Sequence, residues 1–139
     1  MAGHVLDTSA IIAYLYDEPG SDIAEAVIFG GSEIRIPFIA LMEVEYKFHR
    51  ELGDELEVAK SMAALNHWPT LVVESDLQWR QQAARVKARG KLSLADAWVA
   101  ALALINDATL VHKDPEFETV ANLKDVKLPY DRDARGRGR

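Results

Sequence analysis

Two aspartates follow predicted strands closely, and ligands of parallel sheets bind at that end of the strands. Asp7 comes directly after a short apolar run, and Asp114 comes shortly after a second run at 109–111. Both residues also have an ordinary structural interpretation. Asp7 can cap the helix that follows it, and Asp114 can act as a turn residue before Pro115. Their positions therefore allow a functional site without requiring one.

Asp96 is the strongest single anomaly in the sequence. It interrupts a stretch, from Leu92 to Leu104, in which almost every residue is apolar. A charge in so hydrophobic a helix is costly unless it is paired or bound to a metal. Asp96 can also occupy the third helical position of a capping box that opens at Ser93. This stretch alone does not decide between the two interpretations.

A fourth carboxylate comes from a predicted helix over residues 38–52. Glu43 and Glu45 both flank its apolar stripe, which includes Val44, so periodicity does not choose between them. An isolated glutamate on a helix is usually a solvent-exposed residue. Either glutamate is therefore a candidate only if the fold brings it to the aspartates.

Carboxylates that converge at one edge of a sheet predict metal-assisted chemistry. Several of them in one place repel each other, and their pKa values rise. A hard divalent cation removes that repulsion, and Mg²⁺ binds oxygen ligands through few carboxylates. Such a cation activates water and stabilises a phosphoryl transition state. The cluster therefore predicts hydrolysis of a phosphodiester.

Short apolar runs alternate with helical patterns along the chain. Strands are predicted at 4–7, 33–36, 70–73, 109–111 and 126–128, the last of them weak. Helices are predicted at 9–16, 21–29, 38–52, 54–67, 76–89 and 93–105. Strands that alternate with helices form βα units, which build a parallel sheet covered by helices on both faces. The predicted fold class is therefore α/β.

The composition is that of a soluble globular protein with one core. The chain has 139 residues, of which 49% are hydrophobic and 27% charged. No apolar run reaches the roughly 18 residues of a membrane helix, and no signal-peptide pattern is visible. The absence of cysteine excludes disulfides and fits a cytoplasmic protein. We expect one domain over residues 1–130 and a basic, disordered tail over 131–139.

The charge is distributed unevenly. The formal net charge of −6 argues against a nucleic-acid partner when taken alone. However, residues 1–74 carry 13 acids and 4 bases, whereas 77–95 carries five bases and no acid. These five bases are Arg80, Arg85, Lys87, Arg89 and Lys91. We predict that they contact RNA phosphates, with Trp79 as a candidate stacking platform, although a solvated helix face is the alternative.

Four segments resemble the acidic motifs of PIN-domain ribonucleases, most closely those of the toxins of VapBC-type toxin–antitoxin pairs. In order they are Val5-Leu6-Asp7-Thr8-Ser9, Ala40-Leu41-Met42-Glu43-Val44, Leu92-Ser93-Leu94-Ala95-Asp96-Ala97 and Leu110-Val111-His112-Lys113-Asp114-Pro115-Glu116-Phe117. The resemblance covers the chain from position 4 to about position 128. It implies a three-layer α/β/α sandwich with a central, mainly parallel sheet of about five strands.

The resemblance also implies a Mg²⁺ or Mn²⁺ site. It makes Asp7, Glu43, Asp96 and Asp114 the catalytic residues, with the three aspartates as metal ligands. Glu43 is chosen over Glu45 by this match and not by periodicity. The implied function is an endoribonuclease toxin that cleaves cellular RNA and is inhibited by a small antitoxin. An antitoxin arginine that mimics the cation would be the simplest inhibitor, and a homodimer is expected.

The fourth motif departs from the family at His112, where threonine or serine is usual. We expect the His112 ring to hydrogen-bond a carboxylate or a water at the metal. The family also has an acid two places after the motif aspartate, here Glu116, and often a hydroxyl near the site, here Ser9. These three residues are expected to support the site. Lys113 is expected to pair with an acid of its own segment.

Two other functions fit parts of the sequence. A catalytically silent PIN-like module would bind RNA or protein without cutting it, and His112 keeps that alternative open. A flavodoxin-like phosphatase or phospho-acceptor domain would share the aspartate after the first strand, but Ser9 stands where its second acid is expected. The sequence contains no P-loop, dinucleotide fingerprint or nucleophile elbow.

Overall fold

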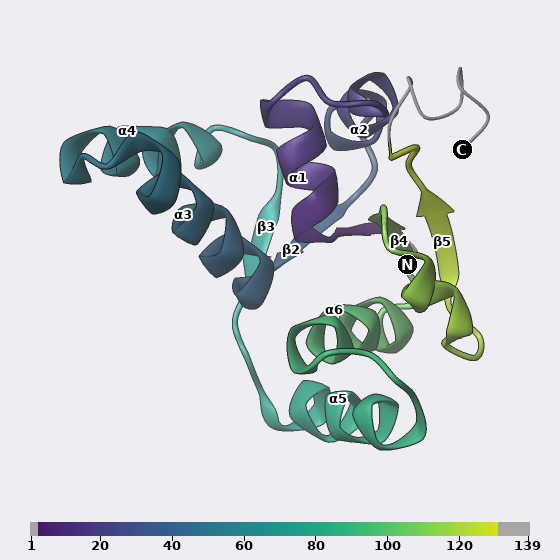
Figure 1. Ribbon diagram of the computed structural model, residues 1–139. Coiled ribbons are helices and arrows are strands. Elements are labelled where there is room, and N and C mark those ends of the chain that lie inside the picture. Colours follow the sequence, from purple (N-terminus) through teal and green to yellow (C-terminus); the bar gives the residue numbers. More distant parts are fainter. Residues whose placement is uncertain (1–2, 131–139) are drawn as a thin grey trace.

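A five-stranded parallel sheet lies at the centre of the molecule, in the order β3-β2-β1-β4-β5 (Figure 1). The computed structural model describes residues 3–130. The strands are β1 (His4–Leu6), β2 (Ile34–Pro37), β3 (Leu71–Val73), β4 (Thr109–His112) and β5 (Lys124–Lys127). The helices are α1 (Thr8–Leu15), α2 (Ser21–Ile28), α3 (Phe38–Leu52), α4 (Glu55–Leu65), α5 (Leu77–Arg89), α6 (Leu94–Ile105) and the 3-10 helix η1 (Pro115–Thr119). This architecture confirms the predicted α/β fold.

The two central strands bring the chain segments after them together. In the register of β1 and β4, Leu6 lies opposite Val111. One residue later, the Asp7 N–H donates to the Val111 carbonyl at 3.0 Å. Asp7 and the segment that begins at Lys113 therefore start from the same edge of the sheet.

Alternate strand residues supply two cores, one on each face of the sheet. Leu6 and Val111 pack on the face covered by α1 to α4, whereas Val5 and Leu110 pack on the face covered by α5 and α6. Figure 1 shows α5 and α6 below the sheet and α1 and α2 above it. Period-two alternation of apolar residues that all become buried is what a sheet covered on both faces requires.

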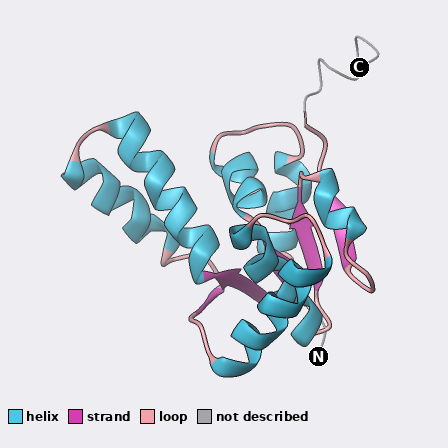
Figure 2. Ribbon diagram, turned by 60° about the horizontal axis from the view of Figure 1, so that its bottom comes forward, coloured by secondary structure: helices cyan, strands magenta, loops and turns pink. Residues whose placement is uncertain are grey.

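The helices α3 and α4 form a hairpin that projects from the body of the molecule (Figure 2). Gly53 ends α3 with a φ of 65°, a left-handed conformation that glycine adopts without steric cost. Asp54 then caps α4 by accepting a hydrogen bond from the Leu56 N–H at 2.9 Å. The predicted break between the two helices is confirmed, and the inner end of α3 lies close to the sheet.

The C-terminal part differs most from the prediction. The strand expected at 126–128 begins two residues earlier, at Lys124, and ends at Lys127. This strand is hard to recognise from the sequence because half of its residues are lysines, and an edge strand buries only part of its surface. The predicted tail at 131–139 lies outside the described residues. Among residues 3–130, no helix is long and apolar enough to cross a membrane.

Candidate active site

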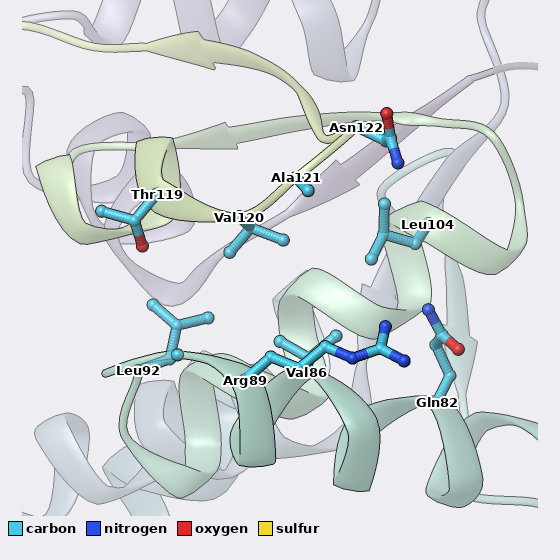
Figure 3. Close-up of a pocket in the computed structure, with 10 residues that line it drawn as sticks. Gln82, Val86, Arg89, Leu92, Leu104, Thr119, Val120, Ala121 and Asn122 are labelled. Atoms are coloured by element: carbon cyan, nitrogen blue, oxygen red, sulfur yellow. The ribbon is translucent and has the colours of Figure 1, made fainter.

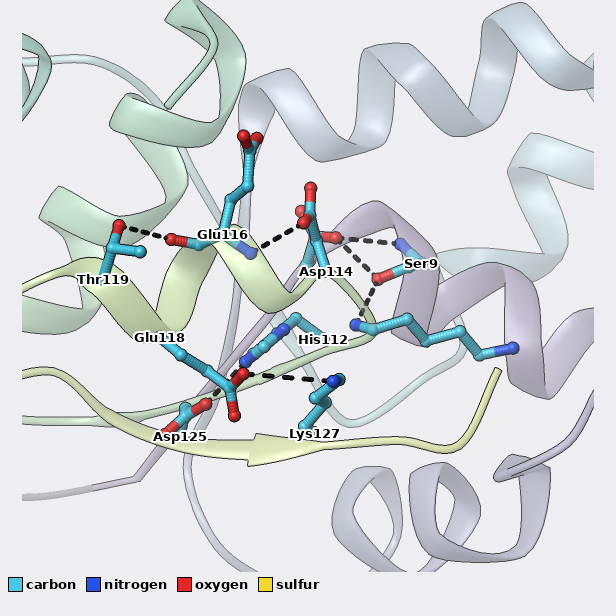
Figure 4. A network of polar contacts seen from close by, with 10 residues as sticks. Ser9, His112, Asp114, Glu116, Glu118, Thr119, Asp125 and Lys127 are labelled. Carbon is cyan, nitrogen blue, oxygen red and sulfur yellow. Dashed lines mark hydrogen bonds and ion pairs between the residues drawn. The ribbon is translucent and has the colours of Figure 1, made fainter. Parts of the chain in front are cut away.

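Three carboxylates converge beside the carboxyl ends of β1 and β4. Asp96, Asp114 and Glu116 each place an oxygen so that the three atoms lie within 4.8 Å of one another. Asp96 comes from the first turn of α6, and the other two come from the start of η1. Figure 4 shows Asp114 and Glu116 side by side, with the Glu116 N–H donating to Asp114 Oδ1 at 2.8 Å. Within the described residues, Asp7 and Glu43 lie outside this group.

The structure also confirms the helix-capping roles predicted for the aspartates. Ser93 caps α6 by accepting the Asp96 N–H at 3.1 Å, so Asp96 holds the third helical position as the capping interpretation requires. Asp114 caps η1, and Asp7 caps α1. Capping fixes the backbone of each aspartate and leaves carboxylate oxygens available. The two interpretations are therefore compatible.

Asp7 is nearly buried, with 6% of its surface exposed. Ser9 holds its carboxylate, because the Ser9 hydroxyl donates to Asp7 Oδ2 at 2.6 Å and the Ser9 N–H donates at 3.3 Å. The same hydroxyl accepts the Lys113 N–H at 3.1 Å, and Figure 4 shows Ser9 with its hydrogen bonds as dashed lines. Burial raises the pKa of Asp7, and the bonds from Ser9 oppose that rise. Ser9 thus joins Asp7 to the segment that carries Asp114.

Glu43 is distinguished from Glu45 by its partner. The Thr8 hydroxyl donates to Glu43 Oε1 at 2.6 Å, which links the start of α1 to α3. Glu45 is exposed and lies 3.8 Å from His49 Nε2. Of the two glutamates, only Glu43 is among the charges that raise the pKa values of Asp7 and Asp96, where burial is the largest cause. The structure therefore brings Glu43, and not Glu45, toward the aspartates.

The charges of three other carboxylates act on Asp96. Burial and the charge of Asp7, followed by the charges of Asp114 and Glu43, raise the pKa of Asp96 to about 6, while a bond with Ser93 opposes them. A divalent cation would remove this repulsion. The donor set consists of hard carboxylate oxygens, with no sulfur or imidazole among the three convergent side chains. That set fits Mg²⁺ or Mn²⁺ rather than a softer metal.

His112 is fully buried, and its ring faces β5 (Figure 4). Its Nε2 lies 2.7 Å from Asp125 Oδ2, and the ring packs edge-on against Phe117 with centroids 4.8 Å apart. Nδ1 has no hydrogen-bond partner among the described residues. His112 does bond a carboxylate, but that carboxylate belongs to the edge strand and not to the convergent group.

The predicted partner of Lys113 is wrong. The Lys113 ammonium lies 3.0 Å from Glu18, in the loop after α1, and not beside the acids of its own segment. Its side chain is almost entirely buried. The aliphatic stem is therefore buried, and the ammonium at its end reaches Glu18. No local pattern reveals a partner 95 residues away.

The five predicted RNA-binding bases do not share one face. Arg80 and Lys87 line a hollow beside Trp98. Arg89 and Gln82 line a separate cavity of about 230 Å³, with η1 and the residues after it across from them (Figure 3). Arg85 and Lys91 are exposed.

The proposed stacking role of Trp79 is wrong. Trp79 is 1% exposed, and its Nε1 donates to the Trp98 carbonyl at 2.7 Å. It also packs edge-on against Phe38. The apolar residues at 83 and 86 on the same face of α5 were the sequence signal for its burial.

Comparisons with known proteins agree with this architecture. Sequence comparison with curated proteins gives no significant match. The structure resembles DNA-bound VapBC from Salmonella typhimurium, with 20% identity, a TM-score of 0.75, and coverage of 91% of this chain and 98% of that one. It also resembles VapBC2 from Rickettsia felis bound to a promoter DNA fragment, with 17% identity, a TM-score of 0.74, and coverage of 91% of this chain and 98% of that one. A third similar structure is VapC20 from Mycobacterium tuberculosis, described as a sarcin-ricin loop cleaving toxin. It has 18% identity, a TM-score of 0.70, and coverage of 90% of this chain and 99% of that one.

A family profile extends the agreement to the sequence. The profile of the PIN domain matches residues 4–123, a range that contains all the convergent carboxylates and their supporting strands. The chain therefore belongs to the PIN domain family.

Proposed function

We propose that this protein is an endoribonuclease that depends on Mg²⁺ or Mn²⁺ and acts as the toxin of a toxin–antitoxin pair. The observation that carries the proposal is the convergence of Asp96, Asp114 and Glu116 within 4.8 Å, with Asp7 and Glu43 close enough to raise the pKa of Asp96. Five acids gathered at one sheet edge cost free energy unless a cation is bound. Membership in the PIN family supports the same reaction class.

The side chains would divide the work according to their positions. Asp96 and Asp114 would hold the cation together with Asp7, and Glu116 would join them from η1. The bound cation supplies activation of water and charge stabilisation at phosphorus. Glu43, held by Thr8, would orient the attacking water and accept its proton. Ser9 keeps Asp7 from turning away.

The RNA and the protein partner belong to the same proposal. The α5 bases Arg80 and Lys87 would contact RNA phosphates beside α6, with Arg85, Arg89 and Lys91 contributing from neighbouring faces. The similar structures include toxin–antitoxin complexes, which supports a small antitoxin that covers the acidic group. We propose a cytoplasmic homodimer as the working form of the toxin.

Incubation of the purified protein with total RNA tests the proposal. We expect cleavage in Mg²⁺ or Mn²⁺ that stops when EDTA is added, and sequencing of the new RNA ends identifies the substrate. A silent RNA-binding module would give no new ends in any cation. Hydrolysis of small phosphomonoesters without RNA cleavage would instead indicate a phosphatase.

A further inference from the structure

A second hollow begins at Glu43 and runs along α3, away from the convergent carboxylates. It has a volume of about 380 Å³ and is lined by Thr8, Glu43, Tyr46, Lys47, Arg50 and Glu51. Five of these residues lie on α3, each three or four positions from another, so they share one face of the helix. The face therefore leads from a proposed catalytic side chain to an aromatic ring and two cations.

The two cations are unusual in this part of the chain. Residues 1–74 contain only four bases, and two of them, Lys47 and Arg50, line this one hollow. Lys47 is engaged, because its ammonium lies 2.7 Å from Glu51 and 5.0 Å from the Tyr16 ring. Arg50 differs. Within residues 3–130, no carboxylate lies within 4.0 Å of its guanidinium, so it retains donors for an anion.

Tyr46 is an exposed aromatic residue, and that guanidinium lies over one face of its ring. Its surface is 56% exposed, and the Arg50 guanidinium carbon lies 5.5 Å from the ring centroid. Arg50 Nη1 also donates to the Tyr46 hydroxyl at 3.3 Å. The pair thus combines a planar face with a positive charge. Single-stranded nucleic acids bind to such combinations through base stacking and phosphate contact.

We propose that Tyr46 and Arg50 form a nucleotide subsite for single-stranded RNA, next to the phosphate that is cut. In this subsite a base stacks on the Tyr46 ring, and the adjoining phosphate pairs with Arg50. The inference rests on the proposed function, because it places the strand that enters the carboxylate group.

The chemistry of the lining favours RNA over a protein segment. Apart from the Tyr46 ring, the lining consists of polar or charged side chains, the two cations together with Thr8, Glu43 and Glu51. By contrast, six of the eight residues that line the hollow between α5 and α6 are apolar, with Arg80 and Lys87 as its two cations. A strand that repeats bases and phosphates matches an alternation of ring and cation.

Binding of a fluorescein-labelled, mixed-sequence, single-stranded 12-nucleotide RNA, followed by anisotropy, tests the subsite. All variants carry Asp96→Asn, so that the RNA is not cut during the titration. We expect Tyr46→Ala and Arg50→Ala each to weaken binding by about 5- to 100-fold, and Arg50→Ala to reduce the salt dependence. Tyr46→Phe keeps the ring and retains most of the affinity.

Two variants on the neighbouring helix α4 serve as matched controls. Leu56→Ala removes an exposed apolar side chain, and Lys60→Ala removes an exposed cation. Both are expected to stay within about twofold of the parent, since neither lines the hollow. Equal losses in the controls and in the Tyr46 and Arg50 variants would overturn the subsite. So would unchanged affinity in those two variants, or no RNA binding by the parent.

The outcomes separate this inference from the proposed function. Metal-dependent cleavage by the wild type with normal RNA affinity in Tyr46→Ala and Arg50→Ala refutes the subsite alone. If Tyr46→Ala and Arg50→Ala lose RNA affinity but the wild type does not cleave RNA, the proposed nuclease activity is refuted and the RNA-binding face remains. Normal RNA affinity with lost affinity for a purified antitoxin would assign the face to the protein partner and overturn the inference.

Discussion

The Thr8 hydroxyl donates a hydrogen bond of 2.6 Å to Glu43 Oε1, and this bond joins the first helix to the third across 35 residues of sequence. Thr8 follows Asp7 directly, so the bond also sets the position of Glu43 relative to Asp7. A charge-assisted hydrogen bond of this length holds a carboxylate in one orientation. Thr8 is therefore the residue that holds Glu43, rather than Glu45, toward Asp7.

Removal of this hydroxyl is expected to slow RNA cleavage. Thr8→Val keeps the shape of the side chain but loses the donor, so Glu43 turns toward solvent. We expect cleavage to fall about tenfold, in line with the loss of one hydrogen bond to a charged group. Thr8→Ser restores the donor and should keep most of the rate. Equal rates in Thr8→Val and Thr8→Ser would show that the bond does not position Glu43.

Neutralising Asp96 is expected to stabilise the metal-free protein. The folded state holds the proton of Asp96 up to a pKa of about 6, above the ordinary value of 3.8. Between these values the folded state binds more protons than the unfolded state, so the free energy of unfolding falls as pH rises. At pH 7.5 in EDTA, the free energy of unfolding of Asp96→Asn should therefore be about 1 kcal/mol higher than that of the wild type. This value includes a reduction for the partial solvent exposure of Asp96.

Chemical denaturation at two pH values checks this sign. The gain should disappear near pH 4, where the wild-type carboxyl is itself largely protonated in the folded state. Glu45→Gln, at an exposed glutamate outside the group, should change stability little at either pH. A destabilised Asp96→Asn at pH 7.5 would contradict the proposed electrostatic strain.

The buried His112 ring is expected to be a major source of stability at the edge of the sheet. His112→Ala leaves a cavity beside Phe117 and removes the partner of Asp125, so we expect a loss of about 2 kcal/mol or more. Asp125→Asn keeps an acceptor for the ring and should cost about 1 kcal/mol. His67→Ala, at an exposed histidine, is the control and should stay within about 0.5 kcal/mol of the wild type. Denaturant midpoints measure all three, and a small effect of His112→Ala would show that the ring is dispensable.

A divalent cation is expected to raise the thermal midpoint of the wild type. Ligands that bind only the folded state stabilise it according to their concentration and affinity. Millimolar Mn²⁺ should therefore raise the melting temperature of the wild type, and Asp114→Asn should lose most of that increase. Glu45→Gln should respond like the wild type. An equal increase in Asp114→Asn would place the bound cation elsewhere.

The sequence predicted the parallel sheet and the common sheet edge from which the segments of Asp7 and Asp114 begin, because both depend on local patterns and on one rule for strand ends. Helical periodicity did not decide between Glu43 and Glu45, and only the family resemblance chose Glu43, because the deciding contact comes from Thr8 on another helix. The pairing of Lys113 with Glu18 and of His112 with Asp125 likewise depends on side chains that meet only in the folded chain. The stacking role predicted for Trp79 was wrong because it was inferred from the neighbouring charges of α5, whereas the apolar face of that helix buries the ring. Glu116 was expected to support the site, but its place in the tightest group of carboxylates depends on the turn of η1.

The most direct test of the central claim is the rate of RNA cleavage by Asp96→Asn in Mg²⁺ or Mn²⁺, compared with that of the wild type at the same protein concentration. Circular dichroism and the melting temperature first establish that the variant is folded. If the carboxylate group holds the catalytic cation, the cleavage rate should fall by about a thousandfold or more, while Glu45→Gln cleaves at the wild-type rate. Cleavage by Asp96→Asn at the rate of the wild type would contradict the assignment of this site.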